Sequence, residues 1–486
     1  MKLLLLAFSV FLFASFANAN DVPVQDAENR LRMAMQTARE RNDKALVAEV
    51  EATGRRVMAD LRAGKEDGVD ARLRAVEVKV GLDAGGRSMA GQPLFTPTPE
   101  MLAESKTLGA KLGAAMQSGD ASQVRAITAE MLRVLGDQAG VPDGRRAGKK
   151  VEPRTISEDA ATKLFLDALA GESRRLRPLL DGEPLPDQMV RIYAYVLTAA
   201  NSARPFAAKH QPEALANLDR LTRGVTRILI DLQQSAGHFP FPDLRGKNIR
   251  FGDLIEKQMQ AGKVETRDGW IVTPDPDGGS QFDTGLGGAA LLAAGELHAR
   301  AEWKRAGLRA ADWALSQPCC PNFNYNAFSV SLLAQAFRST GELKYLEGAL
   351  QKFRVGVAPG QAPNGRWIDA HNARTVYHTI ILRALADLRS VLPADRRAER
   401  AEVDRITQPA ITALLDEFDA MGITVEALPE LLALSEIHPD DARLRAATES
   451  MSASIVAKCT DGQRVKMGAQ PHQLASVPAA VAWLAR

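Results

Sequence analysis

The chain has 486 residues, with 61 lysines and arginines against 59 aspartates and glutamates, and a formal net charge of +2. Hydrophobic residues make up 45% of it and charged residues 25%, which is typical of a folded globular protein. These values exclude an intrinsically disordered chain and a coiled-coil rod, and the balanced charge argues against a dedicated nucleic-acid binder. The length fits two domains, or one large domain with an extension.

The first 19 residues have the pattern of a secretory signal peptide. Lys2 supplies a positive charge, residues 3–16 form an apolar stretch, and Ala17-Asn18-Ala19 resembles a small-residue cleavage site. The apolar stretch is too short for a good membrane span, and no later segment has 18 uninterrupted apolar residues. We therefore expect a periplasmic or secreted protein with no membrane span after signal cleavage.

Residues 20–141 are expected to form a small helical N-terminal domain. Apolar residues such as Leu31, Met35 and Leu46 recur there at nearly helical spacing. Residues 142–154 are rich in glycine, proline and charge, with few apolar side chains, which predicts a linker. The rest of the chain, 155–486, is expected to be a second domain.

After the linker, amphipathic helices come in pairs separated by short polar loops. The expected pairs are 187–201 with 212–234, 283–299 with 302–317, 325–340 with 343–353, 370–392 with 397–420, and 425–437 with 440–458. Two further helices, at 156–170 and 473–484, have no neighbour in sequence and would pair with each other to close a ring. Asp283 and Tyr325 are 42 residues apart, a repeat length typical of helical arrays and toroids.

The two helices of each pair differ in charge. The first is almost uncharged, as in 285–295 (GLGGAALLAAG), which predicts burial on all sides. The second carries charges, as in 302–309 (EWKRAGLR), which predicts a half-solvated outer helix. The pattern predicts an all-α protein, an α/α toroid of about six hairpins with inner and outer helix rings. Strand signals are nearly absent, and 269–273 is the best candidate.

Two segments resemble the α/α-toroid group, which includes polysaccharide lyases, unsaturated-uronyl hydrolases and six-hairpin glycosidases. They are 281–298 (QFDTGLGGAALLAAGELH) and 364–378 (NGRWIDAHNARTVYH), and the resemblance extends over roughly 155–486. It implies a carbohydrate-active enzyme. The Gly-Gly-Trp-Pro pattern of pectate lyases is replaced here by GHFPFP at 237–242, which departs from the pattern for pectate itself.

In such a barrel the active site lies where loops enter the inner helices. Helix N-termini there present unpaired N–H groups and positive dipole ends, which suit anionic or hydroxyl-rich ligands. His371, Asn372, Tyr377 and His378 form the densest polar cluster, and we predict that the first three catalyse a β-elimination. Arg374 shares a helical face with Tyr377, and Arg374 or Arg245 would meet the substrate carboxylate. The alternative is that Tyr377 and His378 are packed and hydrogen-bonded inside the barrel.

Other residues at the same entrances are candidates for substrate binding. Asp283 and Asp369 could serve a glycoside hydrolase as paired carboxylates, although either could instead cap a helix. Aromatic faces stack on sugars, and asparagine bonds to their hydroxyls. Four residues are therefore expected to contact sugar, unless they form a capping turn and core: Asn324, Tyr325, Asn326 and Trp367.

No cofactor or metal ligand set is expected. The loop 275–279 (DPDGG) could bind calcium, but it lacks the further ligands of an EF-hand and also reads as a turn. Cys319, Cys320 and Cys459 would form one disulfide or remain as buried thiols. The chain has no phosphate loop, dinucleotide fingerprint, serine nucleophile elbow or zinc motif, which disfavours nucleotide and serine-hydrolase chemistry.

These features favour an enzyme that cleaves an acidic poly- or oligosaccharide by β-elimination. A glycoside hydrolase of the same fold is the first alternative, and a non-catalytic periplasmic scaffold that binds a glycan or a protein is the second. The aromatic content of 5% is low for a sugar-binding cleft, which favours the scaffold. The products separate the three, because only a lyase makes a conjugated double bond and a scaffold leaves the polymer intact.

Overall fold

The computed structural model describes most of the chain from residue 43 to residue 460. The described residues are 43–63, 65, 68–80, 98–142, 177–185, 189–210, 212–245, 249–275, 278–421 and 427–460, with six positions in 27–38 and residues 480 and 483. Four predicted segments lie wholly or almost wholly outside them: the signal peptide at 1–19, the linker at 142–154 and the two closing helices at 156–170 and 473–484.

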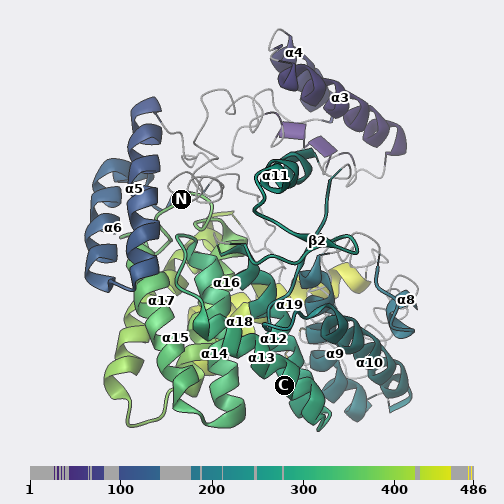
Figure 1. The fold of residues 1–486 in the computed structure, drawn as a ribbon, viewed down its shortest axis with the longest axis vertical. Coiled ribbons are helices and arrows are strands. Elements are labelled where there is room, and N and C mark those ends of the chain that lie inside the picture. The colour runs from purple at the N-terminus through teal and green to yellow at the C-terminus, as the bar shows by residue number, and fades with distance from the viewer. Residues whose placement is uncertain are drawn as a thin grey trace.

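Five pairs of consecutive helices form the main body of the described chain (Figure 1). Each corresponds to a pair expected from the sequence, with ends that shift by a few residues. The pairs are α9 (Val190–His210) with α10 (Leu215–Leu232), α12 (Gly279–Leu297) with α13 (Ala301–Ser316), α14 (Phe323–Thr340) with α15 (Leu343–Gly356), α16 (Thr375–Val391) with α17 (Arg397–Met421), and α18 (Leu428–Ile437) with α19 (Ala442–Thr460).

The first helices of the pairs form an inner layer. They contact one another in chain order, α9 with α12, α12 with α14, α14 with α16 and α16 with α18. Each second helix contacts its own partner most extensively, which places it outside. This arrangement confirms the predicted all-α α/α-toroid fold over five hairpins. The sixth pair, which would close the ring, stays a prediction.

Glycines let the inner helix α12 approach its partner α13 closely. A Cβ atom on Gly295 would lie 2.6 Å from the Lys304 backbone nitrogen, and one on Gly307 would lie 2.7 Å from Leu292 Cγ. Side chains at these positions would push the two helices apart. The Gly/Ala-rich sequence of α12 therefore reflects close packing, and burial all round it is what the apolar pattern predicts.

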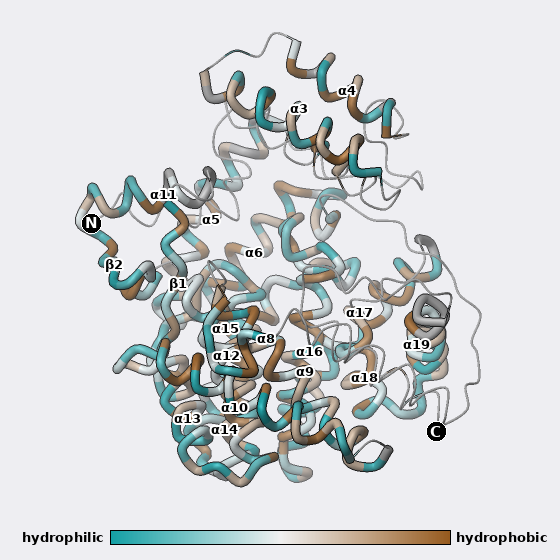
Figure 2. The backbone as a smooth tube through the Cα atoms, turned by 90° about the vertical axis from the view of Figure 1, so that its right-hand side faces the viewer, coloured by the Kyte–Doolittle hydropathy of each residue, from teal (hydrophilic) through white to brown (hydrophobic). Residues whose placement is uncertain are grey.

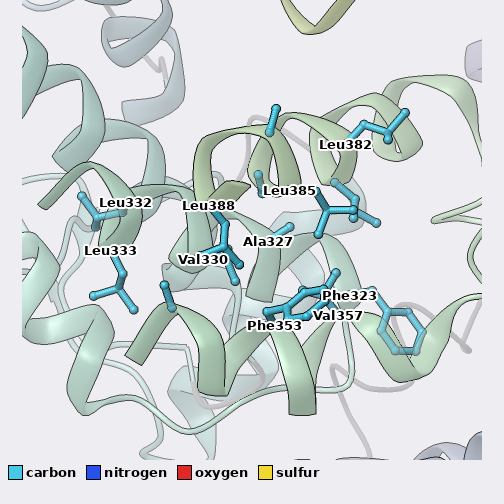
Figure 3. Packing of buried hydrophobic residues seen from close by; sticks show 14 of the residues in the cluster. Phe323, Ala327, Val330, Leu332, Leu333, Phe353, Val357, Leu382, Leu385 and Leu388 are labelled. Atoms are coloured by element: carbon cyan, nitrogen blue, oxygen red, sulfur yellow. The ribbon is translucent and has the colours of Figure 1, made fainter. Parts of the chain in front are cut away.

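The inner helix α14 packs against both its partner α15 and the next inner helix α16. Phe323, Ala327 and Val330 of α14 pack among residues of both neighbours (Figure 3). The residues that Figure 3 shows from those neighbours are Phe353 and Val357 in and after α15, and Leu382, Leu385 and Leu388 of α16. The inner layer therefore rests on continuous apolar packing, which fixes the positions of the helix N-termini.

The helices before the barrel fall into two groups. α5 (Pro99–Ser118) and α6 (Ala121–Leu135) share the barrel's core cluster, and the Gly140 N–H that follows them donates to Ile368 O at 3.1 Å. α3 (Lys44–Arg62) and α4 (Val69–Lys79) contact each other and bury small clusters of their own. Figures 1 and 2 both show α3 and α4 at one end, away from the barrel helices. The domain boundary expected at 142–154 stays a prediction.

A small antiparallel sheet lies between the first two hairpins in sequence. Its strands are β1 (Phe241–Pro242), β2 (Thr266–Arg267) and β3 (Trp270–Ile271), in the order β1-β3-β2. β3 confirms the strand predicted near 269–273. α11 (Ile249–Gln260) stands between β1 and β2, and short helical segments occur at α8 (Arg177–Leu180), η1 (Gly136–Gln138), η2 (Pro212–Ala214) and η3 (Ala358–Gly360).

Within the described part of the chain, every helix is too short or too polar to cross a membrane.

Candidate functional site

The loop that enters α16 contains several residues singled out from the sequence. Residues 369–374 form a turn, and the helix begins at Thr375 instead of the predicted residue 370. The Asp369 carboxylate accepts hydrogen bonds from the Asn372 backbone N–H at 2.8 Å and from Asn372 Nδ2 at 2.9 Å. Such local side-chain bonds compete with helix formation, which explains the late start of α16.

Asn372 also joins this loop to the first turn of α14. It is completely buried, and its Oδ1 accepts a hydrogen bond from Asn324 Nδ2 at 2.7 Å and another from the Asn324 N–H at 3.2 Å. Three predicted site residues, Asp369, Asn372 and Asn324, therefore form one buried network. The geometry supports a positioning role for this network, and the catalytic role of Asn372 stays a prediction.

Asn326 and Trp367, expected to contact sugar, are both fully buried. Asn326 Nδ2 donates to Gly356 O at 2.8 Å and to Cys320 O at 2.7 Å, and Trp367 Nε1 donates to Val357 O at 3.0 Å. These bonds fasten loops to the ends of neighbouring helices. Neither side chain presents a face to solvent in this arrangement.

His371 and Tyr377 are partly exposed and lie against each other. Their ring centroids are 4.0 Å apart with an interplanar angle of 26°, so the rings stack. Arg374, also partly exposed, occupies the N-cap position of α16 between them in sequence. The structure therefore brings together three of the predicted site residues, His371, Arg374 and Tyr377.

Arg245 has carboxylate partners of its own in the loop after β1. Its Nη2 lies 2.7 Å from Asp243 Oδ2, and its Nη1 lies 3.4 Å from Glu256 Oε2. These two acidic groups neutralise the guanidinium locally. The predicted binding of a substrate carboxylate by Arg245 is untested and would have to compete with them.

Asp283 forms a two-pronged ion pair with Arg191, a residue that sequence reasoning missed. Arg191 Nε donates to Asp283 Oδ1 at 3.0 Å, and Nη2 donates to Oδ2 at 2.9 Å, which joins the inner helices α9 and α12. The Arg191 guanidinium also stacks 3.9 Å from the centroid of the Phe282 ring. Tyr325 lies nearby, with its ring centroid 6.0 Å from that of Phe282.

Three tyrosines of the inner helices are linked to this pair, or to one another, by electrostatic interactions. Burial raises the pKa of Tyr195 on α9, which also feels the charges of Arg191 and Glu430 and the hydroxyl of Tyr377 on α16. Burial likewise raises the pKa of Tyr325 on α14, which feels Arg191 and the same Tyr377 hydroxyl. These interactions connect side chains of three inner helices.

Glu430, in the first turn of α18, has a carboxyl group whose pKa is strongly raised. Burial raises its pKa to about 7, the nearby Asp387 acts in the same direction, and Arg383 acts against it. Its Oε2 is buried and has no hydrogen-bond partner among the described residues. A carboxyl group in this setting is protonated in a large fraction of molecules near neutral pH.

Asp387 on α16 lies in a different environment. Its Oδ1 accepts a hydrogen bond from Arg383 Nε at 3.0 Å, and its Oδ2 accepts hydrogen bonds from the Ser331 hydroxyl and from Gln335 Nε2. A cationic partner and hydroxyl donors stabilise the charged form of a carboxylate. Glu430 and Asp387 are therefore two interacting carboxyl groups whose surroundings differ, a pattern typical of acid–base pairs.

We refer to the polar residues of the inner helices that are linked by these ion pairs and electrostatic interactions as the axial cluster. It consists of Arg191, Tyr195, Asp283, Tyr325, Tyr377, Arg383, Asp387 and Glu430. Sequence reasoning identified only Asp283, Tyr325 and Tyr377. Glu430 had a usable signal, because it is an acidic residue near the start of the otherwise apolar stretch 427–434 of an inner helix.

His378 is completely buried beneath the site. Its Nε2 lies 2.8 Å from Ala410 O, and its ring meets that of Trp367 edge to face. Burial lowers the pKa of His378 well below its ordinary value, and the positive charge of Arg366 acts in the same direction. The imidazole is therefore neutral and packed, as the alternative interpretation of this segment expects.

Cys319 and Cys320 are buried free thiols in the loop before α14. Burial raises the pKa of Cys320 to about 12, so the thiol stays protonated. Lys352 is buried nearby and donates from Nζ to Gln317 O at 2.8 Å. The side chain of Cys459 lies outside the described residues.

No group of three or more His, Cys, Asp or Glu side chains that could hold a metal ion occurs in the part of the chain that the structure describes. In the suggested calcium loop, Asp275 Oδ2 accepts a hydrogen bond from the Gly279 N–H at 3.0 Å, as in a turn. Residues 276 and 277 lie outside the described residues, and the calcium expectation is untested.

Comparison with known proteins gives fold-level likenesses. No protein-family model and no curated protein sequence matches this chain. Among solved structures, it is similar to an unsaturated glucuronyl hydrolase from Streptococcus agalactiae, with 10% identity, a TM-score of 0.42, and coverage of 71% of this chain and 98% of that one. It is also similar to a cellobiose 2-epimerase from Spirochaeta thermophila DSM 6192, with 12% identity, a TM-score of 0.41, and coverage of 68% and 99%.

Proposed function

We propose that this protein is a carbohydrate-active enzyme that hydrolyses glycosidic bonds at the axial cluster. The observation that supports this most strongly is Glu430, whose pKa is about 7 and which interacts electrostatically with a second carboxyl group, that of Asp387. Glycoside hydrolysis commonly uses two carboxyl groups, one of which must be protonated at the working pH. Glu430 would be the protonated member of such a pair, and Asp387 would be the other.

In this mechanism Glu430 is the general acid. It donates its proton to the glycosidic oxygen as the bond between that oxygen and the anomeric carbon breaks. Asp387 accepts a proton from a water molecule, whose oxygen forms the new bond to the anomeric carbon. Proton exchange with solvent then restores both carboxyl groups. The hydrogen bonds from Arg383 and Ser331 fix the position of the Asp387 side chain for this role.

β-Elimination on an acidic saccharide, the reaction favoured by the sequence, is the second candidate. The stacked pair of His371 and Tyr377 at the entrance to α16 favours it, because an elimination needs a base for the α-proton and an acid for the leaving oxygen. Asn372 is not part of this version of the proposal, since it is buried and bonded to Asp369 and Asn324.

We also propose that the enzyme acts in the periplasm or outside the cell. The basis is the signal-peptide pattern of residues 1–19. Sequencing the N-terminus of protein from the periplasmic fraction tests this directly. A mature chain that begins at residue 20 would support it, and a full-length chain confined to the cytoplasm would contradict it.

The test of the proposed reaction is a substrate panel with two readouts. The mature protein is incubated with pectate, alginate, hyaluronan, chondroitin and neutral cello-oligosaccharides, with and without calcium. Reducing ends and the ultraviolet absorbance of unsaturated uronates are followed together. Hydrolysis predicts reducing ends without absorbance, and elimination predicts both. No cleavage of any polymer would contradict both reactions and favour a scaffold that only binds.

Two variants assign the reaction to the axial cluster. E430Q removes the acid but keeps the size of the side chain, and we expect its cleavage rate to be about 10²–10⁴-fold lower than that of the original protein. E436Q is the matched control, because Glu436 is an exposed glutamate of the same helix α18. An E430Q protein with full activity would exclude Glu430 as the acid.

A further inference from the structure

Arg191 presents an unused hydrogen-bonding edge beside the axial tyrosines. A guanidinium carries five N–H donors in a planar fork. Asp283 takes the edge formed by Nε and Nη2. Nη1 has no acceptor among the described residues, so the second edge, formed by Nη1 and Nη2, remains available. The side chain is 24% exposed, whereas that of Asp283 is 4% exposed, so Arg191 is the member of the pair that is open to solvent.

The guanidinium is held rigidly in place. The Phe282 ring lies 3.9 Å beneath it, and Phe282 is fixed in turn by the Phe328 ring at a centroid distance of 4.3 Å. Both prongs of the Asp283 ion pair restrict rotation within the guanidinium plane. An arginine fixed in this way loses little conformational entropy when it binds a second anion.

Tyr325 is a neighbouring hydroxyl donor. Its ring and the Arg191 guanidinium both pack on Phe282, with 6.0 Å between the two ring centroids, and Tyr325 is partly exposed and interacts electrostatically with Arg191. The hydroxyls of Tyr325 and Tyr377 make no hydrogen bond with any residue that the structure describes. Burial raises the pKa of Tyr325, so its hydroxyl stays protonated and can donate.

We propose that the open edge of Arg191 and the Tyr325 hydroxyl bind the carboxylate of a uronic acid unit in the substrate. A carboxylate matches the fork of a guanidinium edge, and a hydroxyl donor beside it satisfies a remaining lone pair. The inference rests on the proposed function in one respect, that the ligand is a saccharide. It makes Arg191 the residue that selects acidic over neutral sugars, a role that sequence analysis predicts for Arg374 or Arg245.

The experiment measures binding, which separates it from the test of catalysis. E430Q protein is titrated calorimetrically with oligosaccharides from pectate, alginate and hyaluronan, each paired with its carboxyl methyl ester. We expect at least one acid form to bind about tenfold or more tightly than its ester, as charge-assisted hydrogen bonds warrant. If E430Q proves fully active, the proposed general acid fails, and the acid-over-ester preference is then read from KM.

Variants assign that preference to Arg191. The double variant R191Q/D283N removes both charges of the pair without leaving either buried alone, and we expect the acid-over-ester preference to fall below about threefold. R204Q/D219N removes another α9 ion pair, that with α10, and should keep the full preference. R191K keeps a charge for Asp283 but cannot offer two edges, so it should also lose most of the preference if the double variant does not fold.

Two results would overturn the inference. One is that the protein with Arg191 intact binds acid and ester forms equally well, or binds no acid form at all. The other is a folded R191Q/D283N protein that keeps the full preference for the acid form.

Discussion

Asn324 donates a hydrogen bond from Nδ2 to Asn372 Oδ1 at 2.7 Å, across 48 residues of sequence. Both residues are buried, and the bond joins the first turn of α14 to the loop that enters α16. Tyr325 is the next residue of α14, and Tyr377 lies in the first turn of α16. The asparagine pair therefore sets the separation of two side chains of the axial cluster.

The first prediction concerns this link. Asn372→Ala removes a side-chain hydrogen bond to the buried Asp369 carboxylate and the acceptor of the Asn324 amide, and the loss of buried hydrogen bonds is costly. We expect a loss of about 2–4 kcal/mol in stability, measured by thermal unfolding. The exposed Gln260→Ala is the control and should change stability by less than about 0.5 kcal/mol. An unchanged unfolding temperature for Asn372→Ala would contradict the role of the link.

The second prediction is the pH dependence of stability contributed by Glu430. Its pKa in the folded protein is about 7, above the ordinary 4.5, so the folded state binds the proton more tightly than the unfolded state. The charged carboxyl is therefore unfavourable for folding, an effect absent below pH 4.5, growing as the pH rises, and complete above pH 7. At about 1.4 kcal/mol per pKa unit, the full effect is about 3 kcal/mol.

E430Q removes this titration and measures it. The variant should match the original protein in stability at pH 4 and exceed it at pH 8, by up to about 3 kcal/mol. Thermal unfolding at a series of pH values provides the comparison. A constant stability difference across this range would show that Glu430 titrates normally.

The sequence predicted the fold better than the site, for a physical reason. The apolar inner helices and charged outer helices are a periodic pattern, and the structure contains five of the predicted hairpins. α16 began late because the Asp369 carboxylate bonds to Asn372 within the preceding turn. The spacing of apolar residues, from which the helix was predicted, carries no information about such a local hydrogen bond.

The site was harder because its members are far apart in sequence. Arg191, Asp387 and Glu430 come from three helices, α9, α16 and α18, and only the assembled inner layer brings these helices together. Their residue types alone are common on helices. The opposite error arose where polar and aromatic residues are conspicuous in the sequence, as at Asn372, Asn326 and Trp367. The connection to an inner helix also needs buried hydrogen bonds, and these three residues make them.

The third prediction separates the two candidate reactions through Tyr377→Phe. If Glu430 is the acid, the Tyr377 hydroxyl contributes at most a hydrogen bond to substrate, and we expect a loss of about tenfold or less. If Tyr377 transfers a proton in an elimination, the loss should be about 10²–10⁴. Initial rates of reducing-end release and of double-bond formation decide between them. We expect the smaller loss, and a large one would move the chemistry to Tyr377.

The fourth prediction concerns thiol reactivity. The pKa of Cys320 is raised from 9.0 to about 12 by burial, and only the thiolate reacts with alkylating agents. At pH 8 we expect Cys320 to be alkylated about 10³-fold more slowly in the folded protein than in urea. Mass spectrometry of the peptide that contains Cys320 follows the reaction. Equal rates in the two states would show that this thiol is neither buried nor protonated.

The most direct test of the account is the pH dependence of saccharide cleavage in the original protein and in E430Q. The account predicts that reducing-end release falls as the pH rises through about 7, because the acid loses its proton, and that E430Q is slower by about 10²–10⁴ at pH 6. An E430Q protein that cleaves at the original rate, with the same pH profile, would contradict it.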